Sequence, residues 1–234
     1  DFGSALIFLS FIFVLFREGL NPNFVFFLAI SLVLALFSLI RPFFYVSVFL
    51  TGVFACFYFL SKKINKKVSI IPLVTAFISS CIYVYSINYV YNDLLSQRHK
   101  DRIDIFLGKE TDIMGVGYNL NQSIIAIGSG GLSGKGYLQG TQTKGRFVPR
   151  QHTDYIFSTI GEEWGFYGTS IIIILFATLV LRILFRAEHQ KNIFGRSYAY
   201  GTASLIFMHF LINVGMSIGL VPTIGIPSVS YTHL

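Results

Sequence analysis

Charged residues are scarce in this chain, and their scarcity excludes an ordinary water-soluble domain. Only 12% of the 234 residues are Asp, Glu, Lys or Arg, whereas soluble proteins carry about 25%. Hydrophobic residues make up 53%, with 25 Phe and 13 Tyr. A chain with so many large apolar side chains and so few charges is typical of a protein embedded in a membrane.

Cysteine is also scarce, which excludes a disulfide scaffold. Cys56 and Cys81 both fall inside apolar runs, so we interpret them as small packing residues. The five histidines are scattered, and no Cys/His spacing indicates a metal site. His209 and Asn213, four residues apart on one apolar run, favour hydrogen bonding between helices over metal ligation.

Long apolar runs predict membrane-spanning helices. They cover residues 23–40, 43–60, 69–91, 166–181 and 197–221. At about 1.5 Å of rise per residue, such runs cross or nearly cross a hydrocarbon core of about 30 Å. A sixth, shorter run over residues 2–16 begins without methionine. We interpret it as a truncated span, because a basic leader and a small-residue cleavage site are both missing.

Basic residues predict the orientation of the chain. They cluster in two places, at Lys62, Lys63, Lys66 and Lys67 and at Arg182, Arg186, Lys191 and Arg196. By the positive-inside tendency both places are cytoplasmic, so the polar segment 92–165 between them is extracytoplasmic. This segment has eight basic and eight acidic residues. The net charge of +7 therefore reflects orientation and contact with anionic lipid, and nucleic-acid binding is not predicted.

These patterns predict an all-α polytopic membrane protein, a transmembrane helix bundle with one large extracytoplasmic loop. Residues 1–91 form transmembrane helices, the first of them partial, and residues 166–227 form two more. Residues 92–165 form the loop, which we expect to hold the catalytic region because loops of this length are usually functional or disordered. Residues 228–234 form an atypical tail that we interpret as a truncated or chimeric end.

A glycine-rich stretch in the loop, residues 129–136, imitates a phosphate-binding P-loop. It lacks the required glycine at Ser129 and the required Ser or Thr at Gly136, and it lies on the wrong side of the membrane for ATP. Its glycines allow a tight turn around Lys135. Two interpretations remain open: a turn that packs the loop on the bundle, or direct contact with a ligand.

A second cluster, residues 152–157, centres on Asp154. Thr153 or Asp154 is placed to cap a helix that continues through Glu162. Asp154 and Glu162 would then share one helical face with Ser158, about 12 Å apart. Because a glycosidase carboxylate pair is separated by about 5–9.5 Å, the pattern favours a single carboxylate base at Asp154. A role for Asp154 as a helix cap remains equally open, and the two roles are compatible.

Ordered motifs across nearly the whole chain resemble those of the SEDS proteins (shape, elongation, division, sporulation). They include residues 1–5, 97–103, 117–118, 121–123, 126–131, 134–136, 140–142, 147–149, 152–157, 161–165, 213–216 and 222–227. Gly134-Lys135-Gly136 with Gly140-Thr141-Gln142 is more similar to the RodA elongation branch than to the FtsW division branch. The amino-acid sequence of the loop is similar to that found in Bacteroidetes-type bacteria.

The resemblance implies a peptidoglycan glycosyltransferase in the bacterial cytoplasmic membrane. Such proteins polymerise lipid II on the outer face and work with a class B penicillin-binding protein. The essential acidic residue of the family falls on Asp154. The orientation predicted from the basic residues agrees, because it places Asp154 outside. Arg150 stands where most relatives have an acidic residue, which leaves no second carboxylate at that position.

The predicted mechanism makes Asp154 the base that takes a proton from the acceptor sugar hydroxyl as it attacks the donor. The donor carries its own leaving group, so no nucleotide is needed. A divalent cation is the one cofactor that this mechanism allows. Candidate substrate-binding residues are Lys135, Arg102, Arg98, Lys144, Gln142 and Glu162. The four cations would offset pyrophosphate charge, Lys135 first because glycines flank it, although a solvated loop charge explains each equally well.

Glu162 has two interpretations: it lines the acceptor path or, more in keeping with its place on a helix, it orients that helix. Two other functions stay open for the whole chain. A flippase for lipid-linked precursors would need polar residues along the spans, which contain few ionisable groups. A non-catalytic scaffold for a penicillin-binding protein would need no particular carboxylate.

Overall fold

The computed structural model describes residues 2–64, 69–109, 116–145, 147–149 and 153–223. Within these ranges the regular structure is helical and no strand is found. The chain divides into two compact units, one formed by Asp1–Asn21 with Asp101–Leu234 and the other by Pro22–Lys100.

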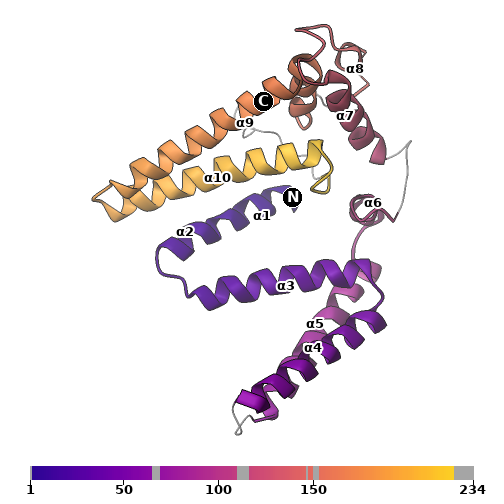
Figure 1. Ribbon diagram of the computed structural model, residues 1–234, viewed down its shortest axis with the longest axis vertical. Helices are drawn as coiled ribbons and strands as arrows, with labels where there is room; N and C mark the ends of the chain where they lie inside the picture. The colour runs from indigo at the N-terminus through magenta and orange to yellow at the C-terminus, as the bar shows by residue number, and fades with distance from the viewer. Residues whose placement is uncertain (1, 65–68, 110–115, 146, 150–152, 224–234) are drawn as a thin grey trace. The chain divides into compact units, whose positions relative to one another are not determined.

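The Pro22–Lys100 unit contains three long apolar helices (Figure 1). They are α3 (Pro22–Ile40), α4 (Phe43–Ile64) and α5 (Ile71–Tyr89), and α5 continues into the π-helix η2 (Val90–Leu94). A small core of Val46, Leu50 and Val84 joins them, and Asn88 donates to the hydroxyl of Ser38 across the interface at 2.7 Å. Most other large apolar side chains of these helices are exposed, as expected for residues that face lipid.

The other unit holds the polar segment and two long helices. Its elements are α1 (Phe2–Phe8), η1 (Leu9–Phe11), α2 (Ile12–Arg17), α7 (Val116–Gly130), α8 (Thr141–Lys144), α9 (Ile156–Glu188) and α10 (Ile193–Ser217). Helix α6 (Gln97–Phe106) crosses the boundary between the two units. Helix α10 packs along α9 and against α1 and α2, and α7 packs on the first part of α9 (Figure 1).

The predicted fold class is confirmed, and each predicted span corresponds to a long apolar helix. Among the described residues, helices long and apolar enough to cross a membrane cover Pro22–Ile40, Phe43–Lys63, Ile71–Leu94, Ile156–Glu188 and Ile193–Ser217. A shorter apolar helix covers Ala5–Arg17. The largest difference is that α9 begins at Ile156, ten residues before the apolar run at 166. Its first part contains Glu162 and Glu163, which break the apolar pattern although both are buried.

Two ion pairs join the end of α2 to the turn between α9 and α10. Arg17 binds Glu188 at 2.9 Å, and Tyr200 donates a hydrogen bond to the same carboxylate. Arg196 binds Glu18 at 3.1 Å. Arg196 is one of the cations that predict a cytoplasmic location, and the structure adds a packing role for it.

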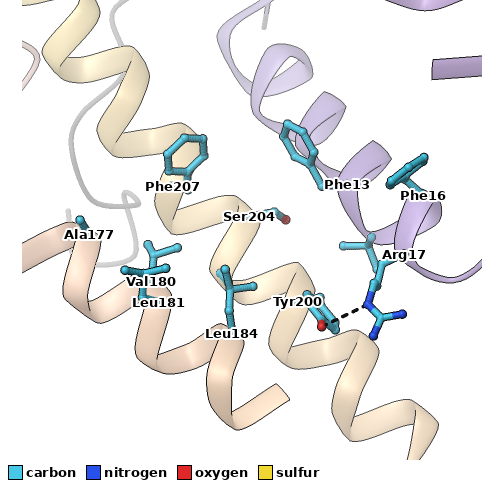
Figure 2. A pocket seen from close by; sticks show the side chains of 12 residues that line it. Phe13, Phe16, Arg17, Ala177, Val180, Leu181, Leu184, Tyr200, Ser204 and Phe207 are labelled. Atoms are coloured by element: carbon cyan, nitrogen blue, oxygen red, sulfur yellow. Dashed lines mark hydrogen bonds between the residues drawn. The ribbon is translucent and has the colours of Figure 1, made fainter. Parts of the chain in front are cut away.

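A hollow of about 550 Å³ lies between α2, α9 and α10 and is lined almost entirely by apolar side chains (Figure 2). Phe13 and Phe16 come from α2, and Leu181 and Leu184 come from α9. Its polar edge is formed by Arg17, whose Nε donates to the Tyr200 hydroxyl at 3.3 Å (Figure 2). Such an apolar space offers few polar groups, whereas the polar segment of this unit brings several together.

Candidate functional site

Helix α9 is interrupted at Gly165, and this interruption organises the polar segment. Gly165 has φ 62° and ψ −157°, a backbone conformation that no helix contains. In an unbroken helix the N–H groups of Phe166 and Tyr167 would donate to the carbonyls of Glu162 and Glu163. At the kink these two donors and two acceptors need other partners, because an unpaired buried backbone group is costly.

The loop that follows α7 satisfies all four groups. The carbonyls of Gly131 and Leu132 accept from the two N–H groups after the kink, at 2.9 and 3.1 Å. The N–H groups of Lys135 and Gly136 donate to the two carbonyls before the kink, both at 3.0 Å. The glycine-rich stretch therefore packs the loop on α9, as one of the two sequence interpretations predicts. Direct ligand contact by this stretch stays a prediction.

Close backbone approach explains why glycine is needed here. A Cβ atom at Gly130 would overlap the carbonyl oxygen of Gly161, and one at Gly134 would overlap that of Glu163. Gly134 and Gly165 also have positive φ, which other L-residues adopt only with strain. The loop and the kink thus fit each other only while these positions lack side chains.

Replacement of Gly165 by alanine should destabilise the protein by roughly 2 kcal/mol or more, because positive-φ strain adds to overlap with Gly134. Thermal unfolding of the purified protein measures the effect. Gly128→Ala is the matched control, since a Cβ there meets nothing within 4 Å and alanine favours the helix by up to about 1 kcal/mol. Equal unfolding temperatures for the two variants would contradict the packing described here.

The carboxylate of Glu162 holds the next part of the loop. Its side chain is fully buried, and Oε1 accepts from Lys135 Nζ at 2.8 Å and from the Gln142 N–H at 2.9 Å. Oε2 accepts from the Thr143 N–H at 2.8 Å, and Lys135 also donates to the Thr141 hydroxyl at 2.8 Å. The donors are backbone N–H groups at the start of α8 and the ammonium group of Lys135. Such donors stabilise the charged form of a carboxylate. The contacts support the interpretation that Glu162 orients this region.

Asp154 lies before α9 rather than on it. The helix begins at Ile156, Tyr155 occupies the N-cap position, and no side-chain capping bond is made there. The predicted cap by Thr153 or Asp154 is therefore wrong, and Asp154 does not share a helical face with Ser158 and Glu162. The physical reason is packing: the buried Tyr155 forms a small core with Ala126 and Val148, which fixes the entry to α9 one residue later.

Two helices hold the backbone at Asp154 in place. Asp154 is 4% exposed, and its backbone carbonyl oxygen accepts a hydrogen bond from Asn213 Nδ2 on α10 at 3.0 Å. The neighbouring Tyr155 rests on Ala126 of α7. Asn213 thus bonds to the turn before α9, whereas its place on an apolar run predicts a bond to another helix. The backbone that carries the Asp154 carboxylate is therefore held by contacts with α7 and α10, which restricts where the carboxylate can lie.

Tyr155 lies within electrostatic range of both Asp154 and Arg102. Burial raises the pKa of Tyr155 to about 12, the adjacent Asp154 carboxylate contributes in the same direction, and Arg102 on α6 opposes it. The phenol therefore stays neutral at physiological pH. Arg102 Nε is buried and has no hydrogen-bond partner among the described residues. Sequence reasoning missed Tyr155; the signal was a large aromatic residue beside the key carboxylate in an otherwise polar segment.

The remaining candidate residues are less closely connected with Asp154. Lys144 is exposed on α8, and Gln142 has a buried Oε1 without a partner in the described part of the chain. Arg98 belongs to α6, but its side chain lies outside the described part, as do Arg150 and the tail 228–234. No group of three or more His, Cys, Asp or Glu side chains gathers as metal ligands within the described ranges.

Known proteins match this chain over part of their length. The peptidoglycan glycosyltransferase MrdB of Escherichia coli is 41% identical over 134 residues, which are 57% of this chain and 36% of that protein. The peptidoglycan glycosyltransferase RodA of Treponema pallidum is 44% identical over 126 residues, 54% of this chain and 29% of that protein. Stage V sporulation protein E of Bacillus subtilis is 38% identical over 132 residues, 56% and 36% of the two chains. The matched region is therefore 29–36% of the length of these relatives.

A solved structure shows the same fold. It was described in a study of the structural coordination of polymerization and crosslinking by a peptidoglycan synthase complex. The similarity has a TM-score of 0.55 at 21% identity and covers 97% of this chain and 48% of the other. A family model of cell cycle proteins, named after FtsW, RodA and SpoVE, matches residues 5–232. With nearly its whole length matched, this chain belongs to the FtsW, RodA and SpoVE family of cell cycle proteins, the SEDS proteins.

Proposed function

We propose that the full-length protein is a peptidoglycan glycosyltransferase that polymerises lipid II during cell elongation. The names of the relatives support this reaction class, since MrdB, RodA and FtsW are all described as peptidoglycan glycosyltransferases. The similarity of Gly134-Lys135-Gly136 and Gly140-Thr141-Gln142 to the RodA branch supports the role in elongation.

The observation that carries the proposal is the buried Asp154, whose backbone carbonyl is held by Asn213. In the proposed reaction the Asp154 carboxylate accepts the proton of a sugar hydroxyl on the acceptor as that oxygen attacks the anomeric carbon of the donor. The new glycosidic bond forms while the bond from the anomeric carbon to the lipid pyrophosphate breaks. A positioned general base of this kind contributes roughly 10²- to 10⁴-fold to a rate.

Arg102 is the cation we propose for the departing pyrophosphate. Its guanidinium acts on Tyr155, the neighbour of Asp154, and its Nε has no partner among the described residues. Lys135, by contrast, is already paired with Glu162 at 2.8 Å. The guanidinium of Arg102 can form charge-assisted hydrogen bonds with phosphate oxygens. The ammonium of Lys135 could do so only after its ion pair with Glu162 breaks. Contact of Lys144, Gln142 or Arg98 with substrate remains a proposal of lower rank.

No nucleotide enters the proposed reaction, because the donor carries its own leaving group. We propose no protein-held metal either, since the described residues bring no set of ligands together. A divalent cation from solution can pair with the pyrophosphate itself. Polymerisation assays with and without a chelator measure that requirement.

The proposed location is the cytoplasmic membrane, with segment 92–165 outside. In a variant without Cys56 and Cys81, a cysteine placed at Lys144 should react with a membrane-impermeant thiol reagent in intact spheroplasts. A cysteine placed at Lys191 should react only after the membrane is permeabilised. The expectation follows from the basic residues near the α9–α10 turn. The reverse labelling pattern would place Asp154 on the wrong side for its proposed substrate.

One experiment separates the proposed enzyme from a flippase and from a scaffold. The full-length protein is reconstituted with a class B penicillin-binding protein, the proposed partner, whose transpeptidase is blocked and whose sequence lacks a glycosyltransferase domain. Formation of glycan strands from labelled lipid II supports the glycosyltransferase. Transbilayer movement of lipid II without strands would identify a flippase, and partner binding with neither activity would identify a scaffold.

A further inference from the structure

A second hollow is lined by other residues of α9 and α10 than those that line the one in Figure 2. Its volume is about 400 Å³, and Arg182 and Arg186 of α9 both line it. The two arginines are one helical turn apart, so their side chains lie on the same face. The other lining residues are Leu179, Ile183, Gln190 and Ala199. The hollow thus combines an apolar wall with two guanidinium groups.

The charges of these two arginines are uncompensated. Neither makes a hydrogen bond or an ion pair with any of the described residues, whereas Arg17 and Arg196 nearby are each bound to a carboxylate. Glu188 is only two residues from Arg186, yet it binds Arg17 and Tyr200 on the other side of α9. The hollow therefore presents two positive charges that no carboxylate of the described residues balances.

The usual structural reasons for basic residues at this place do not account for both arginines. A cation near a helix C-terminus can bind the last carbonyl groups of that helix. Neither guanidinium makes such a bond among the described residues, and Arg182 lies a full turn before Arg186. Orientation by the positive-inside tendency requires charge at this membrane face but no hollow between apolar side chains.

We propose that this hollow binds the phosphate of an anionic membrane phospholipid, with phosphatidylglycerol and cardiolipin as the chemical class. The two guanidinium groups would bind phosphate oxygens, for which their planar fork is suited. Leu179 and Ile183 would contact the first part of an acyl chain, because α9 and α10 are membrane-spanning helices with lipid beside them. The apolar wall favours a lipid over a soluble phosphate. Basic hollows between membrane helices are known sites for such headgroups.

Native mass spectrometry of the full-length protein in neutral detergent tests the site, with phosphatidylglycerol and phosphatidylcholine as probes. We expect phosphatidylglycerol to bind the wild type more tightly than phosphatidylcholine. The Arg182→Gln/Arg186→Gln variant should bind phosphatidylglycerol roughly 30-fold more weakly, which corresponds to about 1 kcal/mol for each basic residue. The Lys62→Gln/Lys63→Gln variant removes the same charge at the end of α4 and should bind as the wild type does.

Two further arms sharpen the result. Arg182→Lys/Arg186→Lys keeps the charge and loses the planar fork, so intermediate affinity supports recognition of phosphate geometry. Equal losses in the two glutamine variants would overturn the proposal, because surface charge alone would then explain binding. Displacement of the lipid by excess inorganic phosphate would overturn it as well, since the site would then recognise a soluble anion. An unchanged unfolding temperature in each variant excludes misfolding as the cause.

Discussion

Asp154→Asn in the full-length protein should reduce polymerisation of lipid II by roughly 10²- to 10⁴-fold while the protein still folds and binds its partner. Asparagine has the size of aspartate and keeps its ability to accept hydrogen bonds, but it cannot take a proton at the required step. The backbone bond from Asn213 to the carbonyl of residue 154 does not depend on the side chain, so the entry to α9 should persist. Glycan strands made from labelled lipid II are measured beside a pull-down of the penicillin-binding protein.

Asp104→Asn is a suitable control for this experiment. Asp104 lies on α6 and forms a partly exposed pair with Lys109 at 3.5 Å, so its loss should change stability by less than about 1 kcal/mol. Polymerisation by the Asp104 variant should match that of the wild type. If the Asp154 variant polymerised equally well, Asp154 would have no part in the chemistry and the proposed mechanism would fail.

The membrane fold could be predicted from the sequence because lipid imposes one dominant rule. Every backbone polar group in the hydrocarbon core needs an internal partner, so long apolar runs must become helices. The five predicted runs accordingly correspond to five helices. The start of α9 could not be predicted in this way, since its first turns contain Glu162 and Glu163, whose burial depends on partners in a distant loop.

Sequence patterns single out Asp154 and the glycine-rich stretch as candidates, but they do not predict the contacts that these residues make. The motif resemblance and the loop pattern both pointed to Asp154, and the glycine-rich stretch was recognised as a tight turn. Its docking on the kink at Gly165 could not be predicted, because hydrogen bonds between backbones carry no residue-type signature. The pairing of Lys135 with Glu162 was missed for a similar reason: residues 27 positions apart show no periodic relation.

Glu162→Gln should destabilise the protein and lower its activity together. The substitution replaces one carboxylate oxygen by an NH₂ donor, which would face either Lys135 or the backbone N–H of Thr143, both donors themselves. Loss of one partner from a buried pair costs about 3–5 kcal/mol, and the lower end applies because the Lys135 side chain is 27% exposed. Displacement of the loop near the site should cost roughly 10²-fold in polymerisation.

A second substitution tells whether Glu162 acts through Lys135 or acts on the substrate. In Lys135→Gln/Glu162→Gln the unpaired ammonium is gone and the two amides can bond to each other, so thermal stability should recover part of the loss. The double variant should be more stable than the sum of the two single variants predicts, which is the signature of a direct interaction. Activity should recover in parallel if Glu162 only positions the loop. A Glu162→Gln protein with wild-type unfolding temperature and no polymerisation would instead show that this carboxylate takes part in the chemistry.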